Sequence, residues 1–220
     1  MQKFPEINNK ELFTKAFTHR SYLNEARKTM ESNERLEFLG DSILSFIISE
    51  HLFNTYPDFN EGILTNLRSL VVNTKSLASE AHNLDFGQYL LLSKGEEESK
   101  GRKNDSILAN TFEAFIGALY IDQGIPAVKK FLQDTLIPHI EEYVKKKVFK
   151  DPKSLLQENV QAKKQNSPLY QVLNEEGPAH AKIFTVGVFI QNENYGVGTG
   201  HTKQEAEERA AKQALEKIGK

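Results

Sequence analysis

Three carboxylates recur at the spacing of one helix face near the start of the sequence. Glu34, Glu37 and Asp41 lie at i, i+3 and i+7, which at about 100° per residue places them within a sector about 60° wide. The same sector continues as Leu44 and Ile48, and the opposite side is apolar too, so we expect this helix to be buried. Three like charges on a buried stripe repel one another and are costly to desolvate unless a cation compensates them. A solvated face is the alternative interpretation.

Gly40 lies within the same segment. A glycine inside a helix costs about 1 kcal/mol relative to alanine, so it usually marks a close approach of another part of the chain. Such an approach serves either the carboxylates or ordinary helix packing.

A second candidate segment runs from Ser106 to Ile121. Glu113 is its only charged side chain, and buried glutamates are rare unless they are paired. Asn110 lies one turn earlier on the same face. A lone glutamate that satisfies a hydrogen-bond network is the alternative. Together with the first three carboxylates, these two residues form an all-oxygen donor set, which suits Mg²⁺ and the metal-assisted hydrolysis of a phosphodiester.

Two further polar residues carry weaker signals. Glu61 follows Asn60, a residue type that caps helices, and an acidic side chain at this place also complements the helix dipole. His19 has no partner at the spacing of metal ligands, which favours a structural role.

The elements that must position these residues fall into two regions. Residues 1–148 read as an all-helical domain, 149–152 as a linker and 153–220 as a smaller domain. Apolar residues recur at helical spacing over Leu36–Leu52, Ile63–Leu77, Ile107–Ile121 and Ala127–Val144. The smaller domain is predicted to hold a helix at Leu155–Lys164, strands at Leu169–Asn174, Lys182–Gln191 and Tyr195–Gly198, and a helix at Lys203–Ile218. The fold class is therefore mainly α, with a small α+β (α-β-β-β-α) domain at the end.

Composition excludes several classes of function. The 220 residues include no cysteine, which rules out disulfide scaffolds, thiolate metal sites and cysteine nucleophiles. No stretch reaches the ~20 apolar residues of a membrane span, and the start lacks the apolar core of a signal peptide, so we expect a cytoplasmic protein with no membrane partner. The net charge of -2, from 28 basic and 30 acidic residues, does not by itself indicate a nucleic-acid partner.

The residues around the carboxylates resemble a known family. Asn33–Ser42 is similar over its whole length to the signature motif of bacterial ribonuclease III, a family of double-strand-specific endoribonucleases. The segments Thr18–Ser21, upstream, and Leu108–Tyr120, downstream, resemble the segments that members of this family have at the same places. The resemblance implies a helical endonuclease domain that forms a homodimer, uses Mg²⁺ or Mn²⁺ without an organic cofactor, and hydrolyses both strands of an RNA duplex. It also implies 5′-phosphate and 3′-hydroxyl ends with a short 3′ overhang, and ribosomal and messenger RNA precursors as substrates.

The resemblance assigns roles to residues by position. The family's metal-binding carboxylates are matched by Glu37, Asp41 and Glu113, and its further acidic residues at the cleavage site by Glu34 and Glu61. Phe38 matches the aromatic residue that inserts into the partner subunit.

Asn110 departs from the family pattern, which usually has Asp at this position. An amide oxygen can still ligate Mg²⁺, but the site becomes one charge less negative. We therefore expect cleavage to survive with weaker metal affinity.

The last domain resembles the double-stranded-RNA-binding domain that follows the nuclease domain in this family. Such domains contact 2′-hydroxyls and phosphates of A-form RNA. The matching positions lie on the first helix, in the first strand connection and at the start of the last helix: Gln157, Glu158, Pro178, Ala179, His180, Thr202, Lys203 and Gln204. Gln204 stands where the family commonly has a second basic residue, which predicts weaker attraction to phosphate and a shallower salt dependence.

Two other functions compete with a dimeric endoribonuclease. Asn110 keeps open a catalytically weakened protein that binds double-stranded RNA without cutting it. A helical metal-binding or scaffolding protein without RNA is disfavoured by the character of the last domain.

Overall fold

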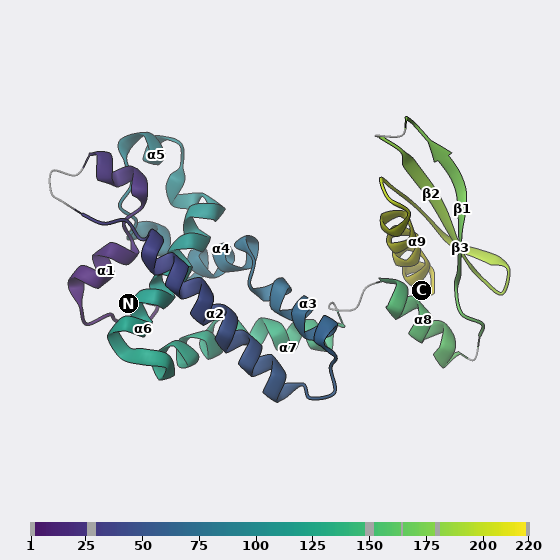
Figure 1. Ribbon diagram of the computed structural model, residues 1–220, viewed down its shortest axis with the longest axis horizontal. Helices are drawn as coiled ribbons and strands as arrows, with labels where there is room; N and C mark the ends of the chain where they lie inside the picture. The colour runs from purple at the N-terminus through teal and green to yellow at the C-terminus, as the bar shows by residue number, and fades with distance from the viewer. Residues whose placement is uncertain (1–2, 26–29, 148–151, 164, 179–180, 219–220) are drawn as a thin grey trace. The chain divides into compact units, whose positions relative to one another are not determined.

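A computed structural model describes residues 3–25, 30–147, 152–163, 165–178 and 181–218. The chain divides into two units, Met1–Phe149 and Lys150–Lys220 (Figure 1). Each unit has its own apolar core. The linker expected at 149–152 lies outside the described residues except for Pro152, which already begins a helix. Proline is well suited to a first helical position because its missing N–H would have no partner there.

In the described part of the first unit the regular secondary structure is helical, with loops between the helices and one bridge between Thr18 and Leu91. Its α-helices are α1 (Lys10–Ala16), α2 (Glu34–Thr55), α3 (Glu61–Val71), α4 (Thr74–Asn83), α5 (Lys94–Glu98), α6 (Asp105–Asp134) and α7 (Ile137–Lys145). Short 3-10 turns lie at η1 (Arg20–Asn24), η2 (Phe86–Gln88) and η3 (Gly101–Lys103). None of the described helices is long and apolar enough to cross a bilayer.

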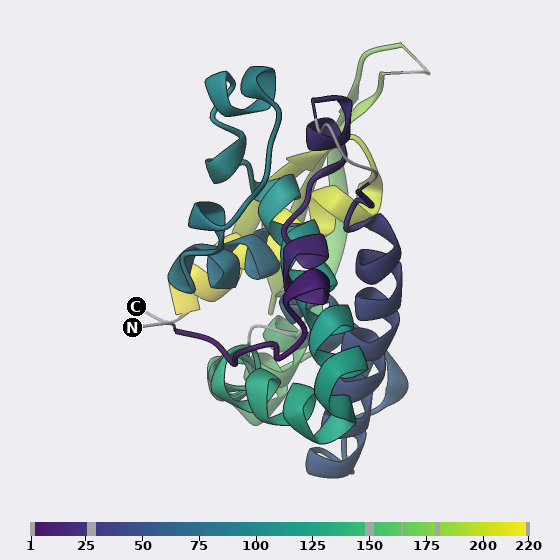
Figure 2. The same cartoon turned by 90° about the vertical axis from the view of Figure 1, so that its left-hand side faces the viewer.

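Helices α2 and α6 run side by side through this unit (Figure 2). The core beside them is rich in phenylalanine, and Phe17, Phe86 and Phe115 are fully buried in contact with one another. The Phe17–Phe86 pair is edge-to-face, an arrangement that fixes ring positions as well as burying apolar surface. The core therefore holds α6 firmly against the rest of the unit.

Two of the four helices predicted from apolar spacing are wrong as single segments. The stretch Ile63–Leu77 is divided because Asn73 adopts an extended conformation and its side chain accepts a hydrogen bond from the N–H of Ser76 at 3.0 Å, capping α4. The stretch Ala127–Val144 is divided between the end of α6 and α7, which begins at Ile137. Apolar periodicity continues across a cap when both helices face the same core.

The second unit has the expected order of a helix, three strands and a helix. It contains α8 (Pro152–Ala162), β1 (Leu169–Glu176), β2 (Ile183–Ile190), β3 (Glu193–Gly200) and α9 (Lys203–Ile218). The sheet is antiparallel with the order β1-β2-β3, and α9 packs against β2, β3 and α8. Gly198 allows this packing, because a Cβ there would lie 2.2 Å from the carbonyl oxygen of Ala206. The prediction of the fold class is confirmed.

Candidate active site

Two glycines set the contact between α2 and α6. A Cβ on Gly40 would lie 1.8 Å from the carbonyl oxygen of Glu113, and one on Gly117 would lie 2.3 Å from the carbonyl oxygen of Leu36. The two backbones therefore touch where α2 carries Glu37 and α6 carries Glu113. The close approach predicted from Gly40 is confirmed, and it is a packing contact between the two helices that carry these carboxylates.

The carboxylates at this crossing act on one another electrostatically. Burial, and after it the charges of Asp41 and Glu37, raise the pKa of Glu113 to about 7. Burial, followed by the charge of Glu34, also raises the pKa of Glu37. Acidic side chains from both helices thus share one region of negative potential, as expected from their spacing in the sequence.

Asn110 contacts this group from α6. Its side chain hydrogen-bonds to that of Glu37, and this contact opposes the rise in the pKa of Glu37. An amide in this position donates a hydrogen bond to a carboxylate, whereas an ionised aspartate would repel it. Asn110 therefore reduces the repulsion within the group.

An open cavity of about 510 Å³ lies beside the carboxylates. The expected residues Glu34, Glu37 and Asn110 line it together with Arg20 and Glu96, which the sequence did not single out. The guanidinium of Arg20 lies 3.8 Å from the carboxylate of Glu34. The cavity thus offers both acidic groups and one cation to a ligand.

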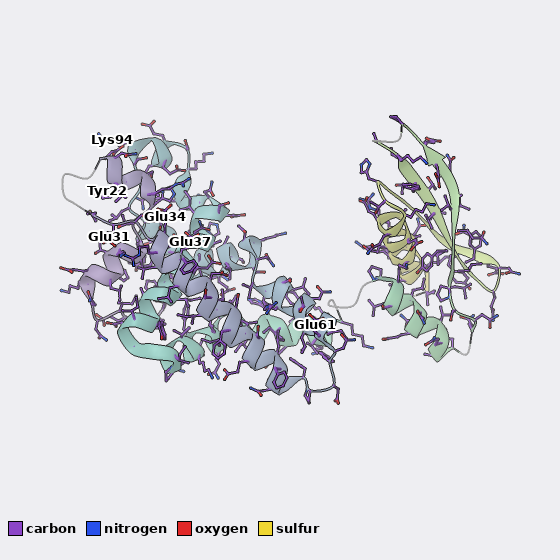
Figure 3. The ribbon with its side chains drawn as sticks, in the orientation of Figure 1. Tyr22, Glu31, Glu34, Glu37, Glu61 and Lys94 are labelled. Atoms are coloured by element: carbon purple, nitrogen blue, oxygen red, sulfur yellow. The ribbon has the colours of Figure 1, made fainter. Side chains whose placement is uncertain are left out.

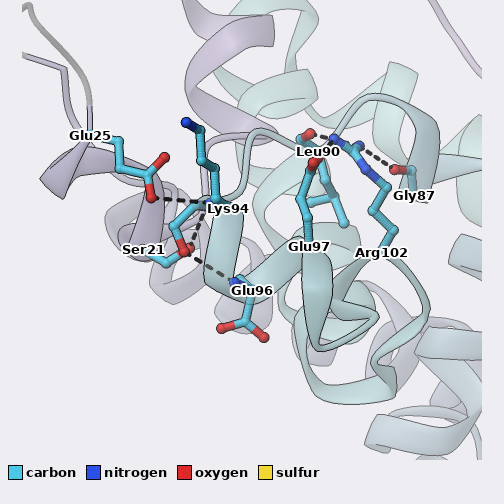
Figure 4. Close-up of polar contacts among 9 residues, drawn as sticks. Ser21, Glu25, Gly87, Leu90, Lys94, Glu96, Glu97 and Arg102 are labelled. Carbon is cyan, nitrogen blue, oxygen red and sulfur yellow. Dashed lines mark hydrogen bonds and ion pairs between the residues drawn. The ribbon is translucent and has the colours of Figure 1, made fainter.

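Glu96 reaches the cavity because the loop before α5 is fastened to η1 (Figure 4). The hydroxyl oxygen of Ser21 accepts a hydrogen bond from the N–H of Ser93 at 3.1 Å, and the hydroxyl oxygen of Ser93 caps α5 by accepting from the N–H of Glu96 at 3.2 Å. His19 Nδ1 lies 2.8 Å from the hydroxyl of Ser21, which is the structural role expected for this histidine. These contacts join residues far apart in the sequence, so spacing could not reveal them.

Glu61 lies away from Glu34 and Glu37, toward the opposite end of α2 (Figure 3). It begins α3 and accepts a hydrogen bond from the hydroxyl of Thr65 at 3.0 Å. It borders a mainly apolar groove of about 680 Å³ that includes Phe46 and Phe53. A single chain does not bring Glu61 to the α2–α6 crossing.

One face of α2 is exposed, contrary to the expectation of a buried helix. Phe38, Phe46 and Phe53 have 78%, 58% and 71% of their surface accessible, and Asp41 is exposed as well. The expectation was wrong because apolar residues on two sides of a helix show that both sides avoid water. They do not show whether a side packs in the core of its own chain or against another molecule. Such a row of exposed phenylalanines is unusual for an isolated soluble domain.

The donor set fits a hard divalent cation in its chemistry. Glu37, Asp41, Asn110 and Glu113 offer only oxygen donors, as Mg²⁺ prefers. Among the described residues, no three His, Asp or Glu side chains converge closely enough to make a complete metal site. Like charges at the crossing repel one another, so side-chain rotation and oxygens from water or substrate are needed to complete the coordination.

The residues expected to bind RNA are spread over one domain. Gln157 and Glu158 lie on α8, and Gln157 and Gln204 line a common groove of about 640 Å³. Thr202 caps α9 by accepting a hydrogen bond from the N–H of Glu205 at 3.1 Å, and Lys203 is the first residue of the helix. Pro178 is exposed, while Ala179 and His180 lie outside the described residues.

Comparison with known proteins identifies both units. Residues 9–140 match the model of the family described as Ribonuclease-III-like, and residues 152–218 match the double-stranded RNA binding motif. The chain is 50% identical over 213 residues to Ribonuclease 3 of Anoxybacillus flavithermus, which covers 96% of this chain and 89% of that protein. It is 48% identical to Ribonuclease 3 of Streptococcus equi subsp. zooepidemicus, with 96% and 92% covered.

The chain belongs to the ribonuclease III family. It is an endoribonuclease of this family that acts on double-stranded RNA. The ribonuclease III nuclease domain from Campylobacter jejuni superimposes with a TM-score of 0.55 at 38% identity, covering 59% of this chain and 87% of that one. Dicer from Pichia stipitis superimposes with a TM-score of 0.52 at 28% identity, covering 97% and 96%.

Proposed function

We propose that this ribonuclease III family member hydrolyses both strands of duplex RNA in a Mg²⁺-dependent reaction, with Mn²⁺ as a substitute. The products would carry 5′-phosphate and 3′-hydroxyl ends with a short 3′ overhang. The single observation that carries the proposal is the α2–α6 crossing, where Glu37 and Asp41 share one electrostatic site with Glu113. Such a concentration of acidic groups beside an open cavity suits a cation and a phosphodiester together.

Four residues would hold the metal: Glu37, Asp41, Asn110 and Glu113. When bound, Mg²⁺ supplies charge neutralisation at the phosphate and lowers the pKa of a water molecule. Glu34 lies on the cavity wall, with Arg20 beside it. We assign to Glu34 the positioning of substrate or water, and to Arg20 the attraction of the RNA backbone.

Asn110 lowers the negative charge of the site by one relative to the aspartate of the usual family pattern. Its hydrogen bond to Glu37 supports a role within the ligand group, because it places the amide against a proposed ligand. We expect a working enzyme that needs more Mg²⁺ for half-maximal activity.

The active protein is proposed to be a homodimer formed through the exposed face of α2. Phe38 projects from the turn that carries Glu37 and Asp41, and the groove beside Phe46 and Phe53 offers an apolar space that an aromatic side chain can fill. The solved nuclease domain of the Campylobacter jejuni protein is described as flexible in its region of dimer formation, which supports a dimer for this chain.

A dimer of this kind also accounts for the position of Glu61. If Phe38 of the partner subunit enters the groove that Glu61 borders, the turn carrying the partner's Glu37 follows it. Glu61 would then serve the active site of the other subunit rather than its own.

The second unit would bind the duplex, and the cellular substrates would be precursors of ribosomal and messenger RNA in the cytoplasm. No organic cofactor or membrane is involved. The competing candidate is a protein that binds duplex RNA but cleaves it poorly, which the amide of Asn110 favours by weakening the metal site.

Incubation of the full chain with labelled duplex or single-stranded RNA, in Mg²⁺ or EDTA, distinguishes these functions. Cleavage of duplex only with metal supports the endoribonuclease, whereas binding without cleavage at any Mg²⁺ or Mn²⁺ concentration supports the competing candidate. Neither binding nor cleavage would contradict both.

A further inference from the structure

A carboxylate and two ammonium groups meet at one end of the sheet in the second unit. Glu175 Oε2 lies 2.7 Å from Nζ of Lys182, and Glu175 Oε1 lies 3.4 Å from Nζ of Lys203. Each oxygen of one carboxylate therefore holds a different lysine. The sequence did not single out Glu175 or Lys182, because the three residues come from different elements.

The sheet register explains why these residues meet. Glu175 pairs with Phe184 across β1 and β2, and Phe184 pairs with Gly200 across β2 and β3. Lys182 immediately precedes β2, and Lys203 begins α9 just after β3. One row across the sheet thus brings the ends of three segments together.

The ammonium groups of both lysines lie over the aromatic ring of Phe184. Nζ of Lys182 lies 5.7 Å from the centre of the Phe184 ring, and Nζ of Lys203 lies 5.5 Å from it. The face of an aromatic ring attracts cations within about 6 Å. The ring and the carboxylate together offset the repulsion between two ammonium groups held at one place.

Two ammonium groups that bind one carboxylate have the charge and the hydrogen-bond donors to bind a phosphate group as well. All three side chains are partly exposed, so an anion in solution can reach them. The lysines also hold the pKa of Glu175 below its usual value, so this carboxylate is ionised wherever a duplex is bound at neutral pH.

We propose that Lys182 and Lys203 form one phosphate-binding pair for duplex RNA, and that Glu175 fills this pair in the free protein and limits RNA affinity by competing with the phosphate. The proposal rests on the proposed binding of duplex RNA by the second unit. Lys182 supplies the second cation that Gln204 does not. On the sequence alone, a shallow salt dependence of RNA binding is attributed to Gln204. In this proposal the cause is instead that Glu175 neutralises lysines that would otherwise contact phosphate.

The competition predicts the behaviour of Glu175→Gln. Removing the carboxylate's charge frees both lysines for phosphate, so binding should tighten by about three- to tenfold at low salt, and the slope of log affinity against log salt should steepen by about one. Lys182→Gln should weaken binding and make the slope shallower by about one.

Two matched variants control for the change in net charge. Glu176→Gln removes the same charge from the next residue of β1, whose carboxylate accepts a hydrogen bond from Asn174 and contacts neither lysine. Lys212→Gln removes a positive charge from an exposed position further along α9. Both controls should change affinity much less than Glu175→Gln does, because neither side chain forms an ion pair within the Glu175–Lys182–Lys203 group.

The test is fluorescence anisotropy of the full chain with a perfect RNA duplex, in EDTA to prevent cleavage, over a range of KCl concentrations. Tighter and more salt-sensitive binding by Glu175→Gln than by Glu176→Gln supports the proposal. If the unmodified protein binds the duplex but Glu175→Gln binds no more tightly than Glu176→Gln, the competition is refuted while duplex binding stands. If the unmodified protein binds no duplex at all, both the proposed function of this unit and the competition fall.

Discussion

Gly40 and Glu113 touch through their backbones: a Cβ on Gly40 would lie 1.8 Å from the carbonyl oxygen of Glu113. Because the obstacle is backbone in the middle of α6, no side-chain rotation can make room for it. The glycine therefore sets the distance between the helices that carry the acidic side chains. Stability and the geometry of the site depend on the same contact.

Gly40→Ala should lower the free energy of unfolding by about 3 kcal/mol, at the upper end of the cost of overpacking a core. Chemical denaturation of the metal-free protein measures this loss. Gly95→Ala is the matched control, since a Cβ at Gly95 in α5 meets nothing within 4 Å. Equal stability of the two variants would show that α2 and α6 can separate at little cost.

The pKa of Glu113 predicts a pH dependence of stability for the metal-free protein. Because this pKa is raised from 4.5 to about 7, folding favours the protonated carboxyl. The stabilisation that this protonation gives is complete below about pH 4.5 and is lost as the pH rises through about 7. Since the group is partly solvated, we expect a loss on the order of 1–2 kcal/mol.

Glu113→Gln removes this titration and provides the comparison. Its unfolding free energy, measured in EDTA from pH 5 to pH 8, should fall less than that of the unmodified protein. Parallel pH profiles for the two proteins would mean that Glu113 is not desolvated at the crossing.

Several of these features follow from the sequence alone. Glycine within a helix, a lone glutamate in an apolar helix and alternation in the strands each report a local environment, so Gly40, Glu113 and the α-β-β-β-α order could be read directly. Glu96 and Lys182 could not, because their contacts depend on how η1 meets α5 and on the register of the sheet. The exposure of Phe46 and Phe53 was also missed, since hydrophobic spacing does not say which surface a helix face packs against.

Asn110→Asp should restore one negative charge to the metal site. We expect the Mg²⁺ concentration for half-maximal cleavage to fall by about tenfold, the size of effect that a charged ligand or its close neighbours have on metal affinity. A Mg²⁺ titration of duplex cleavage by both proteins tests this. An unchanged midpoint would show that residue 110 does not ligate the metal.

The position of Glu61 predicts that it acts across the dimer. Glu61→Gln and Glu113→Gln should each impair cleavage when both subunits carry the change. A mixed dimer, isolated through two different affinity tags, has Glu61→Gln in one subunit and Glu113→Gln in the other. If Glu61 acts across the interface, this dimer contains one site with both changes and one site with neither. This dimer should nick one strand of a duplex at a rate close to that of a single intact site.

The same mixed dimer also distinguishes the alternative arrangement. If Glu61 served its own subunit, each site of the mixed dimer would carry one change and neither would cut. A mixed dimer as inactive as its parents would therefore contradict action across the interface. Phe38→Ala should separate the subunits in analytical ultracentrifugation and abolish cleavage by the resulting monomer.

The central claim is that the α2–α6 crossing is a Mg²⁺-dependent centre for hydrolysis of duplex RNA, and Glu113→Gln tests it most directly. Cleavage of an end-labelled duplex should be compared with the unmodified protein in Mg²⁺, and duplex binding should be compared in EDTA. We predict that binding is retained within about threefold while cleavage slows by at least about a hundredfold, as expected when a metal ligand is lost. Full cleavage by Glu113→Gln, or cleavage by the unmodified protein in EDTA, would contradict the account.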